Sequence, residues 1–368
     1  MKRKYIFPLA AAVCLLTACG DKSFDKKPAE GTARPAETQV TAAETTAVTT
    51  TAETTTTLAT TSAPPEVDTY EMVGPCILAY EGTPQVRAME RCYYDENNGK
   101  YLADCVNSFA ENAGDEVSVR LMMIPSSEEY YAPSGIKKDA PSQIKSEKKV
   151  YKKLTAAKGV KIAELLDEHK AEYLYSRTDY HWQPLAAFYA AREFASQAEV
   201  PFAEFDTYEA VEREGYLGAF YTVNNIQALA EYPDLFTYYK PANLDKCKVF
   251  FNDTWFGGKY ESKLFFEDMD ISSSYTVFVG TDQAIIEVDT DVKNDRVLVI
   301  FKDSYGNALV PFLTQSFSKI YVCDNRFFDV NSLWFVNEVG ATDVLFALGA
   351  ASTGDYDKIS LIEQHMWW

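Results

Sequence analysis

The last third of the chain alternates short, continuously apolar runs with segments of helical periodicity. The apolar runs cover residues 296–301, 319–323 and 343–348, and helical patterns at 305–317 and 330–339 separate them. Runs of Val, Ile and Leu without polar alternation are typical of strands that are buried on both faces. The pattern therefore predicts a parallel βαβαβ unit whose sheet is covered by helices on both sides.

The same alternation appears earlier in the chain. Residues 100–113 have apolar positions at helical spacing, and Val117–Ile124 is predicted to be a buried strand that ends at Pro125. Pro184, which is favourable in a first helical turn, opens a predicted helix that runs to about Gln197. Two segments lie between these elements: a polar stretch expected to be a loop (126–149), and a stretch expected to be helical in part (150–169).

Shorter apolar runs lie just upstream of the βαβαβ unit, between residues 248 and 288. Their alternation with polar residues indicates antiparallel strands, in segments that include 249–251, 263–266, 276–279 and 284–286. Taken together, the patterns predict an α/β protein. We expect a three-layer, flavodoxin-like parallel sheet with helices on both faces and small antiparallel additions.

The N-terminus has the pattern of a secretory signal peptide. Three basic residues precede an apolar run that is too short to span a bilayer, and the run ends in Leu16-Thr17-Ala18-Cys19-Gly20. This ending resembles the lipobox of bacterial lipoproteins, in which cleavage occurs before the cysteine and its thiol receives diacylglycerol. We therefore predict a signal peptide over 1–18 and lipidation of Cys19; the alternative is a secreted protein whose Cys19 is not modified.

Residues 19–67 are rich in Thr, Ala, Glu and Pro and contain few large apolar side chains. Such a segment buries too little surface to offset its conformational entropy, so we predict a disordered tether. The remaining residues, 68–368, are about as long as one sizeable domain.

Composition and charge exclude several classes of function. The formal net charge of −19 argues against binding to nucleic acid, which requires clustered Lys and Arg. The cysteines beyond Cys19 have no spacing suited to zinc, and we expect buried thiols with at most one disulfide, such as Cys76 to Cys92. The segment that starts at Asp268 lacks the Gly and Glu of a calcium loop. We expect neither a metal nor a cofactor.

A hydroxyl group follows the first strand of the βαβαβ unit, in Lys302-Asp303-Ser304-Tyr305-Gly306-Asn307. Ligands of parallel sheets bind at the carboxyl ends of the strands, and a helix that starts there offers N–H groups to an anion. Ser304 is therefore a candidate nucleophile. The alternative is that the Ser or Asp of this segment only caps the helix.

A candidate base for Ser304 occurs in Asp179-Tyr180-His181. Residues two apart in extended backbone point the same way, so the Asp179 carboxylate is expected to hold the His181 ring while Nε2 faces Ser304. The chain has two other histidines: His169 is predicted to be a helix-surface residue, and His365, two residues after Glu363, is a competing base.

These segments resemble a known family. Three stretches, Tyr175-Ser-Arg-Thr-Asp-Tyr-His-Trp-Gln-Pro, residues 301–313 and residues 320–328, are similar to the DHHW protein family of Gram-positive bacteria. That family is in turn similar to SGNH-type hydrolases and to alginate O-acetylation proteins, in which an Asp-x-His pair precedes the serine. The resemblance implies an SGNH-like fold and a triad of Asp179, His181 and Ser304. The sequence departs from the family in two places: Tyr180 stands for the first His, with its side chain expected to point away, and Lys302 stands for the usual Gly before Asp-Ser.

Further residues are candidates for contact with the substrate. By analogy with these hydrolases, Asn307 and the backbone of Gly280 are candidate oxyanion donors, and Arg177 is a candidate for orienting a substrate oxygen or, alternatively, for anchoring the Asp179 loop. Tyr305 and Trp182 are candidates for stacking on a sugar, although aromatic residues at such spacing are commonly core residues.

The sequence thus predicts an extracytoplasmic, lipid-anchored serine esterase or O-acyltransferase that acts on acetyl esters of cell-surface or extracellular polysaccharide. The expected partners are a glycan or an acylated small substrate, the membrane through the lipid on Cys19, and a membrane protein that donates acyl groups. The rival hypothesis is a surface module that binds carbohydrate and keeps the triad residues without using them.

Overall fold

A computed structural model of the chain describes residues 68–252, 257–280 and 282–367. The predicted signal peptide, Cys19 and the tether lie outside these described residues. Within the part that is described, no helix has the length and apolar character needed to cross a membrane.

An eight-stranded sheet forms the centre of the structure, in the order β5-β4-β13-β11-β12-β10-β8-β9. The first five strands in this order are parallel, whereas β10 is antiparallel to both β12 and β8, and β9 is antiparallel to β8. The strands are β4 (Ser118–Ile124), β5 (Lys158–Gly159), β8 (Lys248–Asn252), β9 (Lys259–Ser262), β10 (Ile285–Asp289), β11 (Val297–Lys302), β12 (Lys319–Asp324) and β13 (Asp343–Gly349). The predicted parallel sheet with antiparallel additions is confirmed.

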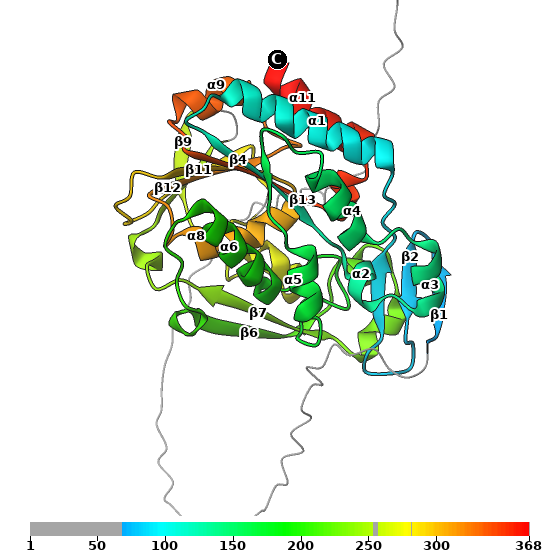
Figure 1. The fold of residues 1–368 in the computed structure, drawn as a ribbon. Coiled ribbons are helices and arrows are strands. Elements are labelled where there is room, and N and C mark those ends of the chain that lie inside the picture. Colours follow the sequence, from blue (N-terminus) through cyan, green and yellow to red (C-terminus); the bar gives the residue numbers. More distant parts are fainter. Residues whose placement is uncertain (1–67, 253–256, 281, 368) are drawn as a thin grey trace, which may run out of the picture. The chain divides into compact units, whose positions relative to one another are not determined.

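Helices cover both faces of this sheet (Figure 1). On one face lie α1 (Glu96–Ala113), α9 (Ser332–Glu338) and α11 (Tyr356–Trp367), which pack on side chains such as Leu121 and Val299. On the other face α6 (Pro184–Ala198) and α8 (Val310–Leu313) pack on the alternate residues, such as Met122 and Ile300. This alternation follows from the period of two along a strand, and it confirms the three-layer prediction.

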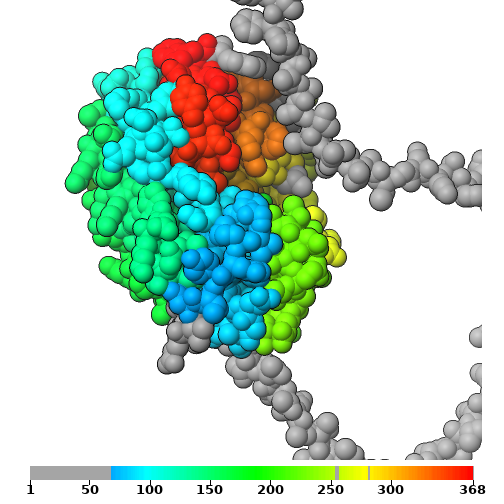
Figure 2. All heavy atoms as spheres, turned by 90° about the vertical axis from the view of Figure 1, so that its right-hand side faces the viewer, coloured from blue at the N-terminus to red at the C-terminus, as the bar shows by residue number. Residues whose placement is uncertain are grey.

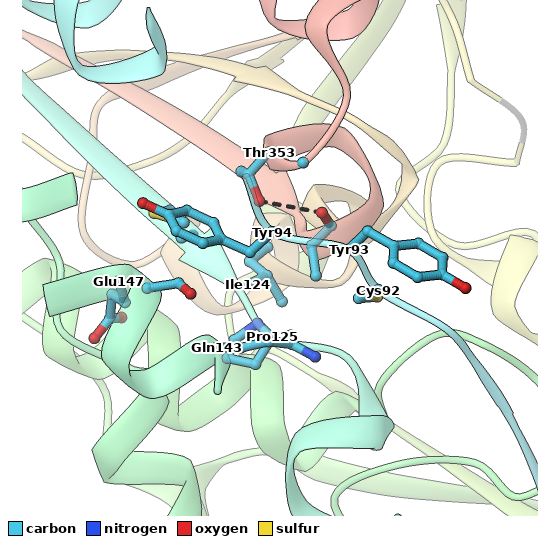
Figure 3. Close-up of a pocket in the computed structure, with 12 residues that line it drawn as sticks. Cys92, Tyr93, Tyr94, Ile124, Pro125, Gln143, Glu147 and Thr353 are labelled. Atoms are coloured by element: carbon cyan, nitrogen blue, oxygen red, sulfur yellow. Dashed lines mark hydrogen bonds between the residues drawn. The ribbon is translucent and has the colours of Figure 1, made fainter. Parts of the chain in front are cut away.

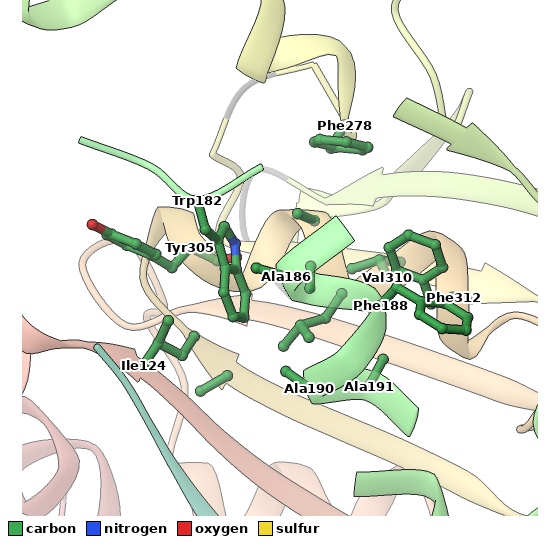
Figure 4. Packing of buried hydrophobic residues seen from close by; sticks show 14 of the residues in the cluster. Ile124, Trp182, Ala186, Phe188, Ala190, Ala191, Phe278, Tyr305, Val310 and Phe312 are labelled. Atoms are coloured by element: carbon green, nitrogen blue, oxygen red, sulfur yellow. The ribbon is translucent and has the colours of Figure 1, made fainter. Parts of the chain in front are cut away.

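Small side chains bring α6 close to the sheet. Ala186, Ala190 and Ala191 of this helix are fully buried, and the ring of Phe188 packs against the ring of Phe312 from α8 (Figure 4). The helix begins directly after His181 and Trp182, so its packing on the sheet fixes the position of that segment.

Two smaller sheets, which the sequence patterns did not predict, flank the central one. One contains β1 (Tyr70–Val73), β2 (Cys76–Ala79) and β3 (Arg87–Glu90), and the other pairs β6 (Glu209–Tyr216) with β7 (Asp234–Lys240). Figure 2 shows the three-stranded sheet (blue) on the same face as α11 (red) and part of α1 (cyan). Short helices link the remaining segments: α7 (Ala219–Thr222), α10 (Ala350–Thr353), and the 3-10 turns η1 (Phe205–Thr207), η2 (Gln227–Glu231) and η3 (Leu244–Lys246).

The prediction of a loop at 126–149 is wrong. This segment contains α2 (Ser127–Tyr131), α3 (Ser134–Asp139) and most of α4 (Gln143–Tyr151). The stretch 150–169, predicted to be helical in part, holds the end of α4, the edge strand β5 and α5 (Ala163–Glu168), so that prediction is confirmed. The buried rings of Tyr130 and Tyr131 fix α2 by tertiary packing, which outweighs the weak local pattern.

Two further elements and the cysteines also differ from the predictions. Residues 276–277 belong to a 3-10 segment, η5 (Ile271–Val277), and the helix expected from Tyr305 starts as another, η6 (Ser304–Leu309). The five described cysteines are free thiols, so the possible disulfide between Cys76 and Cys92 does not form.

Candidate active site

Ser304 lies at the carboxyl end of β11, a central strand with parallel neighbours on both sides. Asp303 caps the turn: its Oδ1 accepts a hydrogen bond from Tyr305 N (3.1 Å). Its Oδ2 accepts from Gly349 N (2.8 Å) and from Ser352 Oγ (2.6 Å). The turn that carries Ser304 is therefore tied to the start of α10.

Asp179, His181 and Ser304 form one hydrogen-bonded chain. Asp179 Oδ1 lies 2.7 Å from His181 Nδ1, and His181 Nε2 lies 2.9 Å from Ser304 Oγ. His181 and Ser304 are 123 positions apart in the sequence. The structure thus brings together the three residues that the sequence analysis selected, and both ring nitrogens of His181 have the partners expected of a catalytic base.

The second oxygen of Asp179 is held by the start of α7. Oδ2 accepts a hydrogen bond from Ala219 N (2.8 Å), and Gly218 packs so closely that a Cβ there would lie 2.4 Å from the Cβ of Asp179. Burial alone would raise the pKa of Asp179. Electrostatic attraction to the neighbouring His181 ring and these hydrogen bonds outweigh burial, so the pKa of Asp179 stays below its ordinary value, which favours the carboxylate form.

Tyr275, which the sequence analysis missed, packs against the other side of the site. Its ring is stacked on the His181 imidazole, with centroids 3.7 Å apart, and its hydroxyl donates to the carbonyls of Ser304 (3.1 Å) and Tyr305 (3.0 Å). Tyr275 therefore contacts both the base and the nucleophile turn. It lies in a 3-10 segment without periodicity, so the sequence offered no signal for it.

Arg177 anchors the loop that carries Asp179. Its Nε lies 3.0 Å from Asp234 Oδ1, and its two terminal nitrogens donate to the carbonyls of Pro84 and Pro233. Asp234 also accepts from Thr178 N (2.8 Å). The side chain of Arg177 is buried and its donors are occupied by other protein groups. Of the two roles that the sequence left open, Arg177 therefore anchors the loop and does not orient a substrate oxygen.

Lys302 points into a buried cluster of charges instead of toward Ser304. Its Nζ lies 2.7 Å from Asp282 Oδ1 and 2.6 Å from Asp324 Oδ2, and Arg326 binds the same two carboxylates. The Nδ2 of Asn307 donates to Asp282 Oδ1 (2.9 Å). Asn307 thus has a structural partner in this cluster, which corrects the expectation that its amide faces the reacting oxygen.

The remaining candidates lie in the packed interior. Trp182 is fully buried and its indole N–H donates to the carbonyl of Tyr305 (3.1 Å); the hydroxyl of Tyr305 donates to Tyr180 O (2.5 Å). Figure 4 shows Trp182 and Tyr305 close together in the core, so of the two alternatives left open for Trp182 the structure shows the core residue. Gly280 has φ +73°, and a Cβ there would lie 3.0 Å from the ring of Phe266.

The other two histidines stand apart from the triad. His169 is partly exposed at the end of α5 and is stacked on Tyr189. His365 is buried against Phe328, and burial lowers its pKa to about 4. Glu363 accepts a hydrogen bond from Tyr101 (2.5 Å), so the competing acid and histidine pair does not act as a unit.

A cavity of about 210 Å³ opens beside Ser304. Besides Ser304 and Tyr305 it is lined by Tyr180, and the triad forms with Tyr180 in place of the first His of the family pattern. The sequence analysis missed several other residues that line it, among them Glu90, Arg326, Ser352 and Lys358. Burial raises the pKa of Glu90. Among the described residues, no three His, Cys, Asp or Glu side chains are grouped so that they could hold a metal ion.

Comparison with known proteins agrees with this geometry. A family model described as DHHW protein matches residues 89–323, which is more than half of the chain. The chain belongs to the DHHW family. A crystal structure of a DHHW family protein from Eubacterium siraeum DSM 15702 is similar with a TM-score of 0.74 and 34% identity, over 80% of this chain and 97% of that one.

The DHHW chain also shares its fold with Bacillus cereus PatB1. The structure of PatB1 with a sulfonyl adduct has a TM-score of 0.62 and 17% identity, over 80% of this chain and 99% of that one. A second PatB1 structure gives a TM-score of 0.61 and 18% identity, over 79% and 98%. No curated protein matches the chain. The DHHW chain therefore has the mixed α/β, SGNH-like fold that the sequence predicted.

Proposed function

We propose that this DHHW protein is an extracytoplasmic serine enzyme that transfers acyl groups, and that acetyl esters of cell-surface or extracellular polysaccharide are its substrates. The observation that carries the proposal is the hydrogen-bonded chain from Asp179 through His181 to the hydroxyl of Ser304. The charged state of Asp179 and the stacking of Tyr275 on the base support it.

In the first half of the reaction, Ser304 Oγ attacks the acyl carbonyl carbon and His181 Nε2 takes the hydroxyl proton. The bond to the leaving oxygen then breaks, His181 gives that oxygen its proton, and an acyl ester remains on Ser304. Water or a sugar hydroxyl attacks this ester in the second half, passes its proton to His181 and regenerates Ser304. Asp179 stabilises the imidazolium in both halves.

The developing oxyanion needs donors that point at the reacting carbon. Ser304 is the first residue of η6. The first N–H groups of a helix have no acceptor within the helix, so the backbone N–H of Ser304 is available to a ligand. This N–H is the donor that we assign to the oxyanion. The side-chain amide of Asn307, which donates to Asp282, contributes by holding the turn.

Labelling with a fluorophosphonate or a sulfonyl fluoride tests the proposal directly, because such reagents react with an activated serine. Wild-type protein is expected to be labelled, with loss of roughly a thousandfold or more in rate for Ser304→Ala and His181→Ala. Matched controls are Ser360→Ala, a partly exposed serine on α11, and His169→Ala. Absence of labelling in folded wild type would remove the proposal and favour a surface module that only binds carbohydrate.

The proposed location rests on the N-terminal sequence alone, Leu16-Thr17-Ala18-Cys19. Lipidation of Cys19 with two or three acyl chains would hold the domain at the membrane on its tether. Incorporation of labelled palmitate into the native chain, lost in Cys19→Ala and kept in the control Cys14→Ala, is the expected result. Palmitate incorporation that persists in Cys19→Ala would refute the anchor without affecting the proposed chemistry.

A further inference from the structure

The cavity beside Ser304 continues into a second, larger cavity. The second cavity has a volume of about 400 Å³ and shares Glu90, Ala351 and Lys358 with the first. Two segments form its walls: residues 90–93, which start at the last residue of β3, and residues from 350 to 358, in α10 and the start of α11. On the face shown in Figure 2, the light blue segment before α1 adjoins the red segment. We call these two cavities the Glu90 groove.

The Glu90 groove has a closed floor. A Cβ at Gly354 would lie 2.3 Å from the carbonyl oxygen of Tyr93, so the two walls meet backbone to backbone at this point. A third cavity shares Tyr93 and Gly354 with the groove, but its volume of about 20 Å³ has room for little more than a water molecule (Figure 3). A large ligand in the groove therefore does not extend into this third cavity.

Two tyrosine rings line the outer part of the groove. Tyr93 is 70% exposed and Tyr356 is 57% exposed, so both side chains are largely open to a ligand in the groove. In Figure 3 the ring of Tyr93 points away from the small third cavity, whereas that of Tyr94 points across it.

Each exposed ring is held from one side. Tyr356 is stacked on Tyr101 with centroids 4.9 Å apart, and the guanidinium of Arg91 lies 5.5 Å from the centroid of the Tyr93 ring. Arg91 is itself fixed by Glu128, 3.1 Å away. Rings that are fixed in this way offer a rigid, amphipathic contact area at low entropic cost, as the apolar face of a sugar requires.

The charges of the groove favour an uncharged ligand. Four described basic residues line the groove. Arg91, Lys302 and Arg326 are bound to carboxylates, whereas Lys358 has no carboxylate of a described residue within salt-bridge distance. The chain as a whole carries −19 charges. A polyanion would meet one unpaired cation in a field of like charge, whereas hydroxyl groups meet both donors and acceptors here.

We infer that the Glu90 groove binds a chain of uncharged glycan, with the acyl-bearing sugar at Ser304 and further sugars over Tyr93 and Tyr356. Only the placement of the acyl-bearing sugar at Ser304 rests on the proposed function. A cavity of about 400 Å³ is within the size of ligand sites, roughly 300–1,000 Å³, so the outer part alone accommodates a ligand.

The test measures binding and turnover separately. Calorimetry measures the binding of an O-acetylated cellohexaose to three variants: Ser304→Ala, and Ser304→Ala combined with either Tyr93→Ala or Tyr356→Ala. Each tyrosine substitution is expected to weaken binding about tenfold. The control Tyr70→Ala, an exposed tyrosine on β1 that lines neither cavity, is expected to leave it unchanged. Equal affinity in all the variants would overturn the inference.

Turnover separates this inference from the proposed function. With Ser304 intact, Tyr93→Ala and Tyr356→Ala are expected to raise KM for the acetylated oligosaccharide about tenfold and to leave hydrolysis of 4-nitrophenyl acetate unchanged. If the wild type hydrolyses neither ester but still binds the oligosaccharide, the proposed function is refuted. The inference that the groove binds a glycan would then still stand. Tighter binding of an acetylated oligogalacturonide than of the cellohexaose would overturn the assignment to an uncharged glycan.

Discussion

The ring of Tyr275 lies parallel to the imidazole of His181, with centroids 3.7 Å apart and planes that differ by 6°. The same tyrosine donates its hydroxyl to the carbonyl of Ser304, so one side chain contacts both the base and the turn of the nucleophile. Catalysis by proximity requires that these two groups keep their relative position. Tyr275 is therefore a positioning residue.

Substitution of Tyr275 separates its two contacts. Tyr275→Phe keeps the stacking and loses the hydrogen bonds, whereas Tyr275→Leu loses both. We expect the rate of fluorophosphonate labelling to fall by less than about tenfold in the Phe variant and by roughly 100-fold in the Leu variant. Thermal unfolding of both variants is the control, and equal labelling rates in the two would contradict a role for the stacked ring.

Gly218→Ala is expected to disable the site through Asp179. A Cβ at Gly218 would lie 2.5 Å from Asp179 Oδ2, the oxygen that Ala219 N holds. Overpacking of this kind costs about 1–3 kcal/mol, and the displaced carboxylate no longer aligns His181. Labelling rate and free energy of unfolding are measured together. In the matched control Gly135→Ala, the new Cβ meets the half-exposed Tyr70 side chain, which can move, so neither quantity should change much.

Arg177→Ala is expected to lower stability without changing substrate affinity. The substitution leaves the fully buried Asp234 without its cation, which costs about 3–5 kcal/mol for a buried pair. Urea unfolding measures the loss, with Arg192→Ala, whose side chain is more exposed, as the control. The prediction is contradicted if Arg177→Ala unfolds at the same urea concentration as wild type and has a higher KM. That result would indicate that Arg177 orients the substrate.

The buried Glu147 is expected to make stability fall as pH rises. Burial raises its pKa from 4.5 to about 7, although its Oε1 accepts hydrogen bonds from Ile162 N and Ala163 N. Between these pH values the folded chain keeps a proton that the unfolded chain has lost, so the free energy of unfolding decreases with increasing pH.

Glu147→Gln removes this titration and keeps the acceptor oxygen. We expect the variant to match wild type near pH 4.5 and to be more stable by up to about 3 kcal/mol at about pH 8. Denaturant unfolding at both pH values checks the expectation. A constant difference between variant and wild type at the two pH values would show that Glu147 is not the group that titrates.

The parts of the fold that the sequence predicted are those with a strong local signal. β11, β12 and β13 are runs of apolar residues buried on both faces, and Asp179 and His181 are two residues apart, so their contact is local. Ser304 was found because parallel strands place their ends at one edge.

The missed parts depend on partners that are distant in the sequence. β6 is mostly exposed, so it lacks the buried pattern of a core strand, and it pairs with β7 across a long connection. β7 has alternate residues buried, but its partner strand is distant in the sequence. The role of Arg177 depends on Asp234, 57 positions away, and Lys302 is buried because Asp282 and Asp324 surround it. The sequence pattern does not show which charged residues pair when they lie far apart in the chain.

Asp303 ties the nucleophile turn to α10, one wall of the Glu90 groove, through Gly349 and Ser352. The turn that carries Ser304 and one wall of the groove are therefore held by the same carboxylate, that of Asp303. Changes near Ser352 would alter both at once, whereas changes at the outer tyrosines alter only the ligand contacts. On the proposed function, substitutions at the far end of the groove are therefore expected to change substrate preference with little effect on the reaction at Ser304.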